Sequence, residues 1–112
     1  MATFTHKPLG QSSIASASNT TVYTLPASTQ AIVKIIWICN TTTSDVTLEM
    51  WYVPNGSSAD NAHKLLPGVT IPASDFKQIN TDMGMITAGD TIQAKGSTNN
   101  AITISLFGAT IA

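Results

Sequence analysis

The chain has 112 residues, of which 43% are hydrophobic and only 10% are charged, and its formal net charge is -1. This length fits one domain with a single hydrophobic core and excludes a second domain. The five basic residues are all lysines, scattered singly and balanced by six acidic residues, so the sequence offers no basic patch and predicts no nucleic-acid partner.

No run of residues approaches the roughly 20 apolar positions that a helix needs to cross a bilayer. The N-terminus also lacks the apolar stretch of a secretory signal peptide. We therefore expect a soluble chain without a membrane partner. The single cysteine, Cys39, lies in an apolar run, where a free thiol is typically a small hydrophobic side chain.

Serine and threonine make up about a quarter of the chain. Threonine, valine and isoleucine favour strands over helices because their branched β-carbons restrict the side chain in a helix. No segment shows a helical period of apolar residues. The predicted fold class is therefore all-β, an antiparallel β-sandwich or jelly roll with an extended N-terminal arm.

The first 19 residues lack a sustained hydrophobic period, and residues 11–19 are small and polar. We interpret residues 1–19 as an N-terminal arm, which either frays or becomes ordered on a neighbouring subunit. Residues 20–112 are then a single β-sandwich domain. If the arm is separate from the core, its removal leaves the fold intact.

The first predicted strands follow the arm directly. Alternating residues from Thr20 end at Pro26, which predicts a short strand and a turn. Residues 30–39 are apolar on both sides except for one lysine, as in a central strand covered on both faces, with Val33, Ile35, Trp37 and Cys39 on one face. Residues 46–53 alternate again, and we expect these two strands to pair as an antiparallel hairpin.

The second half of the chain predicts a long loop and several shorter strands. Pro54-Asn55-Gly56 begins a polar loop that extends to Asn61,. Strand candidates follow at residues 63–66, 69–71, 76–79, 83–88, 91–95 and 101–107, and the last of these places Ile102, Ile104 and Leu106 inward. Six to eight strands, separated by turns every 8 to 12 residues, are typical of a sandwich or jelly roll.

The sequence contains little that supports catalysis. The candidate ligands include His6, His63 and Cys39, and Asp60 with His63 is their one close grouping in the sequence. A solvated loop explains this pair better than a metal site. Cys39 suits packing rather than nucleophilic attack, and Glu49 suits a solvent-facing strand position rather than a pair of catalytic carboxylates. No nucleophile elbow or phosphate-binding loop occurs. We predict no enzyme activity, no metal and no cofactor.

The aromatic residues Trp37, Trp51 and Tyr52 are predicted to lie on adjacent strands. Exposed rings would either stack on sugar faces or anchor a protein interface, and packing in the core is the alternative. If Tyr52 faces the core, Trp51 points to the opposite side of the strand. Trp51 is therefore the leading candidate for an apolar interface anchor.

Short turn and strand signatures follow one another along nearly the whole chain: LGQ at residues 9–11, VYTLPA at 22–27, WICN at 37–40, ITAGDTI at 86–92 and FGATI at 107–111. In this order they resemble a family of small β-rich virion proteins of tailed bacteriophages. The family pattern often ends in Gly-x-Glu-Ile, whereas this chain has Thr110 in place of the acid, so a role of that acidic group does not carry over. The resemblance implies a non-enzymatic part of a virion.

The leading interpretation is a capsid decoration, or cement, protein. It would form a homo-oligomer, with a trimer expected, on the outer surface of the head, where it would bridge and stabilise subunits of the major capsid protein after assembly in the host cytoplasm. Modest contacts suffice because a symmetric shell repeats each of them many times. The alternatives are a tail, neck or fibre-associated component of the virion, and a carbohydrate-binding β-sandwich module that binds a glycan through its aromatic residues.

Three parts of the chain are expected to make the contacts. Residues 3–11 would lie on a neighbour as the arm, Trp51 would be an apolar anchor, and the loop at residues 55–61 would be a contact tip. The residues expected at these interfaces are Phe4, Lys7, Leu9, Gln11, Trp51, Asn55 and Asn61.

Overall fold

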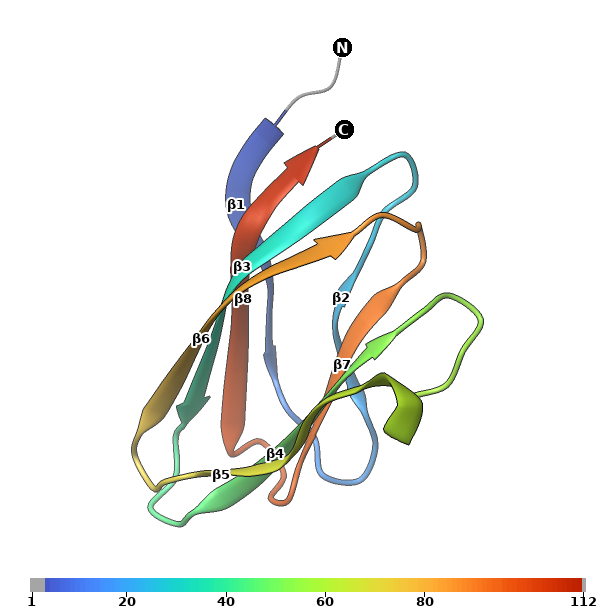
Figure 1. The fold of residues 1–112 in the computed structure, drawn as a ribbon. Helices are drawn as coiled ribbons and strands as arrows, with labels where there is room; N and C mark the ends of the chain where they lie inside the picture. Colours follow the sequence, from blue (N-terminus) through green and yellow to red (C-terminus); the bar gives the residue numbers. More distant parts are fainter. Residues whose placement is uncertain (1–3, 112) are drawn as a thin grey trace.

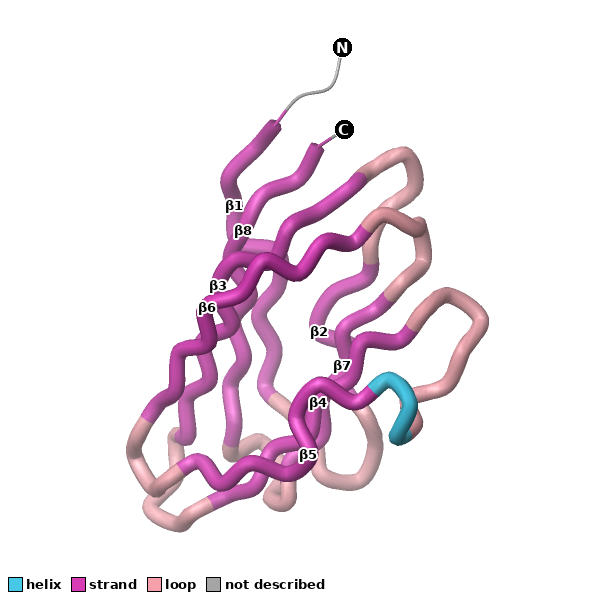
Figure 2. Tube along the Cα trace, viewed as in Figure 1, coloured by secondary structure: helices cyan, strands magenta, loops and turns pink. Residues whose placement is uncertain are grey.

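The structure is a computed structural model that describes residues 4–111, and it contains eight strands and one short 3₁₀ helix, η1 (Figure 1). The strands are β1 (Phe4–Ser13), β2 (Thr20–Thr24), β3 (Gln30–Asn40), β4 (Val46–Val53), β5 (Lys64–Ile71), β6 (Phe76–Met85), β7 (Thr91–Gly96) and β8 (Ile102–Ile111), and η1 spans Asn61–His63. The strands dominate the chain, and loops connect them at both ends of the molecule (Figure 2).

The strands form two four-stranded antiparallel sheets, in the orders β1-β8-β3-β6 and β2-β7-β4-β5. We call them sheet A and sheet B. The first strand pairs with the last, the second with the seventh, the third with the sixth and the fourth with the fifth. This nested pairing is that of a long hairpin folded over on itself, which is the jelly-roll form of a β-sandwich. The predicted all-β class and antiparallel β-sandwich or jelly roll are confirmed.

The core lies between the two sheets and is built from one side of each strand. Ile102, Ile104 and Leu106 of β8 face inward as the sequence predicts, and all three are fully buried. From the opposite sheet, Leu48 and Met50 of β4 are also fully buried. Alternation of inward and outward residues fixes which side chains form each outer face.

The N-terminal arm is not confirmed. Residues 4–13 form β1, which pairs with β8 from Phe4 opposite Ile111 to Ser13 opposite Thr103. Leu9 belongs to the hydrophobic core, and the α-carbon of Gly10 packs so closely against the backbone carbonyl of Val22 that a β-carbon would not fit. The polar residues around Leu9 conceal this strand in the sequence. Thr3 lies outside the described residues.

Strand β3 differs from its prediction because of a bulge. Its register with both neighbouring strands shifts between Val33 and Ile35, so the inward side changes from odd to even positions at Lys34. Val33 therefore faces the core, whereas Ile35 and Trp37 point to the outer face and are only half-buried. The predicted shared face of Val33, Ile35, Trp37 and Cys39 is wrong, and β3 is not covered on both faces.

The expected hairpin between β3 and β4 is also wrong, because the two strands lie in different sheets. Asn40 holds the connection that crosses from one sheet to the other. Its buried amide nitrogen donates to the carbonyl oxygens of Ser44 at 2.9 Å and Ile71 at 3.0 Å. Its side-chain oxygen accepts from the backbone nitrogen and hydroxyl of Thr42 at 3.0 and 2.8 Å. The connection after β3 is thus a corner between the two sheets, held by hydrogen bonds of the Asn40 side chain, and not a hairpin turn.

Candidate functional site

The central rows of the outer face of sheet A carry no charged side chain. Residues that lie directly opposite each other in an antiparallel sheet share a face, so the strand register gives the rows of side chains across β1, β8, β3 and β6. These rows are Pro8, Phe107, Ile35 and Asn80; then Gln11, Ser105, Trp37 and Gln78; then Ser13, Thr103, Cys39 and Phe76. We call this set the uncharged face.

Aromatic and amide contacts organise the uncharged face. The rings of Trp37 and Phe76 are stacked, with centroids 4.7 Å apart and planes 6° from parallel. Phe76 nevertheless remains 52% exposed. The side-chain nitrogen of Gln11 donates to the hydroxyl of Ser105 at 3.0 Å, which leaves Ser105 buried. The face therefore combines large apolar rings with neutral hydrogen-bonding groups.

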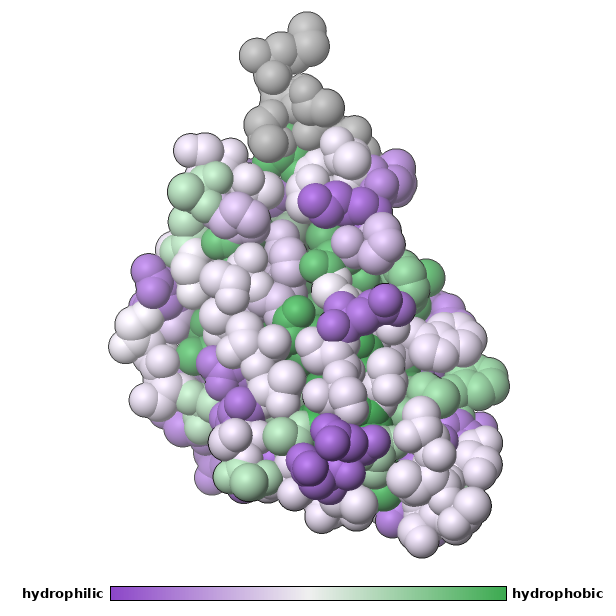
Figure 3. Space-filling model, turned by 180° about the vertical axis from the view of Figure 1, so that it is seen from behind, coloured by the Kyte–Doolittle hydropathy of each residue, from purple (hydrophilic) through white to green (hydrophobic). Residues whose placement is uncertain are grey.

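The charged groups of this side of the molecule lie beyond these rows. Lys34, in the middle of β3, forms an ion pair with Asp82 at the bulge. Lys7 of β1 lies near the bulge, opposite Gly108. On the side of the molecule opposite the view of Figure 1, hydrophilic residues are scattered rather than gathered into one patch (Figure 3).

The outer face of sheet B has a different character. Glu49 of β4 lies opposite Lys95 of β7 and accepts a 2.8 Å ion-paired hydrogen bond from Lys64. The ammonium nitrogen of Lys64 also lies 5.4 Å from the ring centroid of Trp51. Sheet B thus presents paired charges to solvent, whereas sheet A presents none across its central rows.

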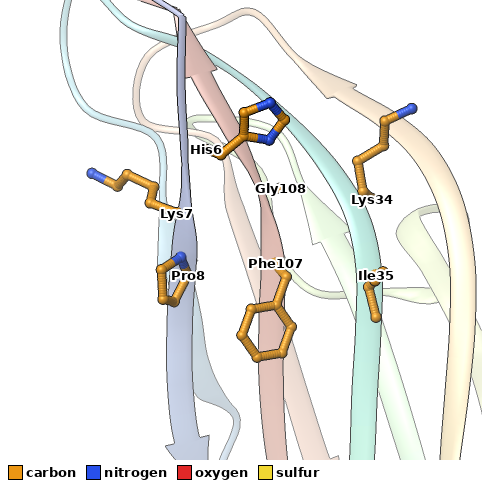
Figure 4. A pocket seen from close by; sticks show the side chains of 7 residues that line it. All are labelled: His6, Lys7, Pro8, Lys34, Ile35, Phe107 and Gly108. Atoms are coloured by element: carbon orange, nitrogen blue, oxygen red, sulfur yellow. The ribbon is translucent and has the colours of Figure 1, made fainter.

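A shallow hollow of about 500 Å³ lies at one end of the uncharged face. Its lining comes from β1, β8 and β3: His6, Lys7, Pro8, Lys34, Ile35, Phe107 and Gly108 (Figure 4). Phe107 lies between the other two strands, while the side chains of Lys7 and Lys34 point away on opposite sides (Figure 4). The hollow therefore has an apolar floor and no convergent charges.

Strand β8 approaches β3 closely beside this hollow. A β-carbon on Gly108 would overlap the carbonyl oxygen of Ile32 and lie 3.2 Å from the backbone nitrogen of Lys34. Both contacts are to backbone atoms, which cannot move without changing the strand pairing. Gly108 is thus required by the bulge that turns Ile35 outward beside Phe107.

The structure separates the three aromatic residues that were expected to act together. Trp37 lies on sheet A, whereas Trp51 and Tyr52 lie on sheet B. Tyr52 packs against the core, and Trp51 lies outside the core cluster, as expected if the two point to opposite sides. Trp51 is only 6% exposed, so it does not present the free apolar ring that an interface anchor needs. The aromatic platform expected for a glycan is not formed.

The remaining expected contact residues are distributed over two regions. On β1, Lys7 and Gln11 are exposed and Leu9 is buried, so Leu9 acts in packing. The side chain of Phe4 lies outside the described residues. Asn55 and Asn61 are exposed in the loop between β4 and β5, and the backbone nitrogen of Asn55 donates to Asp90 at 2.8 Å.

The residues considered for metal binding are divided among three places in the fold: His6 on β1, Cys39 on β3, and Asp60 with His63 at η1. His63 contacts Asp60 at 2.8 Å, and Asp60 also accepts from the backbone nitrogen of Ala62, which caps η1. Within residues 4–111, no three potential ligands come together. The described part of the chain also has no helix that is long and apolar enough to cross a membrane.

The fold is similar to chains from viral particles. A crystal structure of the T13 particle of infectious bursal disease virus matches 98% of this chain with a TM-score of 0.58 at 5% sequence identity. A structure of the Gx strain of the same virus matches 98% of it with a TM-score of 0.50 at 10% identity. The chain spans about 30% of the length of each matched chain. No protein-family model matches, and no curated protein gives a significant match.

Sequence reasoning missed Phe76 and Phe107 as surface residues. Phe107 was expected at the end of a strand, and Phe76 at the start of a short one. Their common face depends on the bulge at Lys34, which brings Ile35 opposite Phe107. The one available signal was the low charge of these strand segments.

Proposed function

We propose that this chain is a structural subunit of a virion and that it joins its neighbours through the uncharged face. The observation that carries the proposal is the absence of charge across the central rows of sheet A, together with the 52% exposure of Phe76. The similarity of the jelly roll to chains of viral particles supports the same function.

The composition of the uncharged face suits a protein contact. Burying an unpaired charge is costly, whereas burying apolar rings is favourable and amide and hydroxyl groups find new partners across an interface. Interface centres are accordingly depleted in charge and enriched in aromatic residues. The opposite face, with Glu49, Lys64 and Lys95, suits exposure to solvent.

Within this function, we propose a decoration protein that sits on the outer surface of a head and bridges subunits of the major capsid protein, without enzymatic activity. The resemblance to tailed-bacteriophage proteins motivates this assignment, while the matched structures belong to a different virus. A tail, neck or fibre position is the alternative. Copy number separates the two, since a decoration protein is present in hundreds of copies.

A charge placed on the uncharged face tests the proposal. Ile35→Glu and Phe107→Glu introduce a carboxylate that binding would have to desolvate, and Thr70→Glu places the same charge on an exposed position of sheet B. We expect the first two variants to lose attachment to heads that lack the protein, and to lose the rise in disruption temperature of those heads. Thr70→Glu should retain both. Retained attachment in all three variants, with normal circular dichroism, would contradict the proposal.

A further inference from the structure

The two sheets have four edge strands, and three of them carry features that hinder pairing with another chain. Strand β1 contains Pro8 and a register shift beside it. Strand β2 is only five residues long and has its own register shift. Strand β5 contains Pro67, a Gly68 with φ of 97°, and two register shifts. Proline, bulges, short length and lysines on the edge are the usual means by which edges resist strand addition.

In its first half, strand β6 has none of the prolines, bulges or short length of the other edges, and Lys77 is its one protecting feature. Residues 76–80 pair without irregularity with β3, from Phe76 opposite Cys39 to Asn80 opposite Ile35, and the register shifts only beyond Asn80. This half contains no proline or glycine, and Lys77 is its one charged residue. It lies at the margin of sheet A (Figure 1), and its residues are exposed or half-buried. Its outer backbone edge is thus open.

The exposed aromatic cluster lies at the same edge. Phe76 begins β6 and stacks on Trp37 of the neighbouring strand, and half of its surface remains open to solvent. An added strand would therefore gain backbone hydrogen bonds along β6 and cover apolar surface next to them. Strand addition derives its affinity from the main chain and its specificity from such side-chain contacts.

We propose that residues 76–80 of β6 pair in antiparallel orientation with the same residues of a second copy of this chain. With the two-fold axis at Gln78, Phe76 lies opposite Asn80 of the partner subunit, and Lys77 lies opposite Ile79 of the partner subunit. The single lysines do not face each other, so the segment pairs with itself without like-charge repulsion. This partner deepens the proposed function and rests on it, because the pairing joins two uncharged faces into one.

The symmetry of this contact has a measurable consequence. A contact that uses the same strand on both copies is two-fold and closed, so it links copies in pairs and leaves no β6 edge free. It does not by itself close a ring of three. Each oligomer of the purified protein therefore contains an even number of subunits. If another contact forms a trimer, that trimer is found in solution as a pair of trimers.

Disulfide crosslinking tests the pairing directly. In a Cys39→Ala background, a cysteine at the two-fold axis faces its own copy, at a separation within the range that a disulfide spans. We expect Gln78→Cys to give a covalent dimer on mild oxidation. Thr70→Cys, an exposed position on β5, should remain largely uncrosslinked. Equal crosslinking at Thr70 would overturn the proposal, as would no crosslinking at Gln78.

A charge variant tests the same contact without crosslinking. Gln78→Lys places two lysines opposite each other at the axis, and we expect it to weaken self-association at least tenfold by light scattering while circular dichroism stays unchanged. A strict monomer or trimer for the unmodified protein would overturn the proposal. The two proposals can be tested separately by combining the variants. If Ile35→Glu and Phe107→Glu lose head attachment while the β6 crosslink still forms, the β6 pairing is supported independently of the contact with the head.

Discussion

The hydroxyl of Tyr52 donates a 2.7 Å hydrogen bond to the carboxylate of Asp90, which is only 5% exposed. The second oxygen of the same carboxylate accepts from the backbone nitrogen of Asn55, and the backbone of Asp90 bonds to Leu25. Asp90 thus joins β4 and the start of the loop between β4 and β5 through its carboxylate, and the turn after β2 through its backbone carbonyl. This bonding fixes the base of the 54–61 loop to the sandwich.

The Tyr52 bond predicts a specific dependence of stability on pH. Burial and the bond to Asp90 raise the pKa of Tyr52 from 10.0 to about 12. Below pH 10, Tyr52 is protonated in both the folded and the unfolded chain, so its hydrogen bond contributes fully to the free energy of unfolding. Between pH 10 and 12 the unfolded chain releases this proton first, and the free energy of unfolding falls as pH rises.

Tyr52→Phe removes this contribution, and we expect a loss of about 1–2 kcal/mol at neutral pH and a shallower decline between pH 10 and 12. Burial also raises the pKa of Tyr23, so Tyr23→Phe is the matched control. This variant should keep the part of the pH dependence of the free energy of unfolding that comes from Tyr52. Urea denaturation across this pH range measures both. Parallel pH profiles for Tyr52→Phe and the unmodified protein would show that the Asp90 bond does not hold the tyrosine proton.

The hydrogen bonds of Asn40 predict that the crossover between the sheets depends on this one side chain for its stability. Asn40→Ala leaves the carbonyl oxygen of Ile71 and the backbone nitrogen of Thr42 without their side-chain partner. Since buried polar groups are costly to leave unpaired, we expect a loss of about 2–4 kcal/mol in the free energy of unfolding. Thr43→Ala, at an exposed neighbouring position, should change it by less than about 0.5 kcal/mol. Equal effects of the two substitutions would contradict a structural role for the Asn40 amide.

The sequence predicted the strand content and the sandwich class because alternation and turn residues are local signals. The range 46–53 for β4 was predicted correctly for that reason. The pairing of strands was not predictable, because the corner at Asn40 depends on Ile71, which is distant in sequence. The uncharged face was missed for a related reason: one inserted residue at Lys34 reverses the side on which every following residue of β3 lies.

The close approach of β8 to β3 at Gly108 predicts that alanine destabilises the protein at this glycine and not at a glycine with open space around it. Gly108→Ala places a β-carbon against the backbone of Ile32 and Lys34, so β8 and β3 must separate there, and we expect a loss of about 2–4 kcal/mol. Gly84→Ala is the matched control, because a β-carbon at that position meets no atom within 4 Å. Thermal unfolding measures both. A neutral Gly108→Ala would mean that the bulge accommodates a side chain, contrary to the close approach of the strands.

The place of β1 in sheet A predicts the outcome of truncation. Deleting residues 4–11 removes most of a strand that pairs along β8, takes Leu9 out of the core, and exposes the edge of β8. We expect the truncated chain to lose its cooperative thermal transition or to aggregate, since an exposed apolar edge strand promotes association. Leu9→Ala alone should lower the free energy of unfolding by about 2–3 kcal/mol. This is less than the loss for a fully buried leucine, which reaches the upper end of the usual range.

Lys7→Ala, an exposed position on the same strand, should leave the transition unchanged, which separates the role of the strand from that of its surface charge. Circular dichroism during heating gives the result for all three proteins. If the truncated chain instead unfolds cooperatively near the temperature of the full chain, then β1 is dispensable for the sandwich. It would then act as the detachable arm that its polar sequence predicts, and its pairing with β8 would be replaceable by a strand from a neighbouring copy.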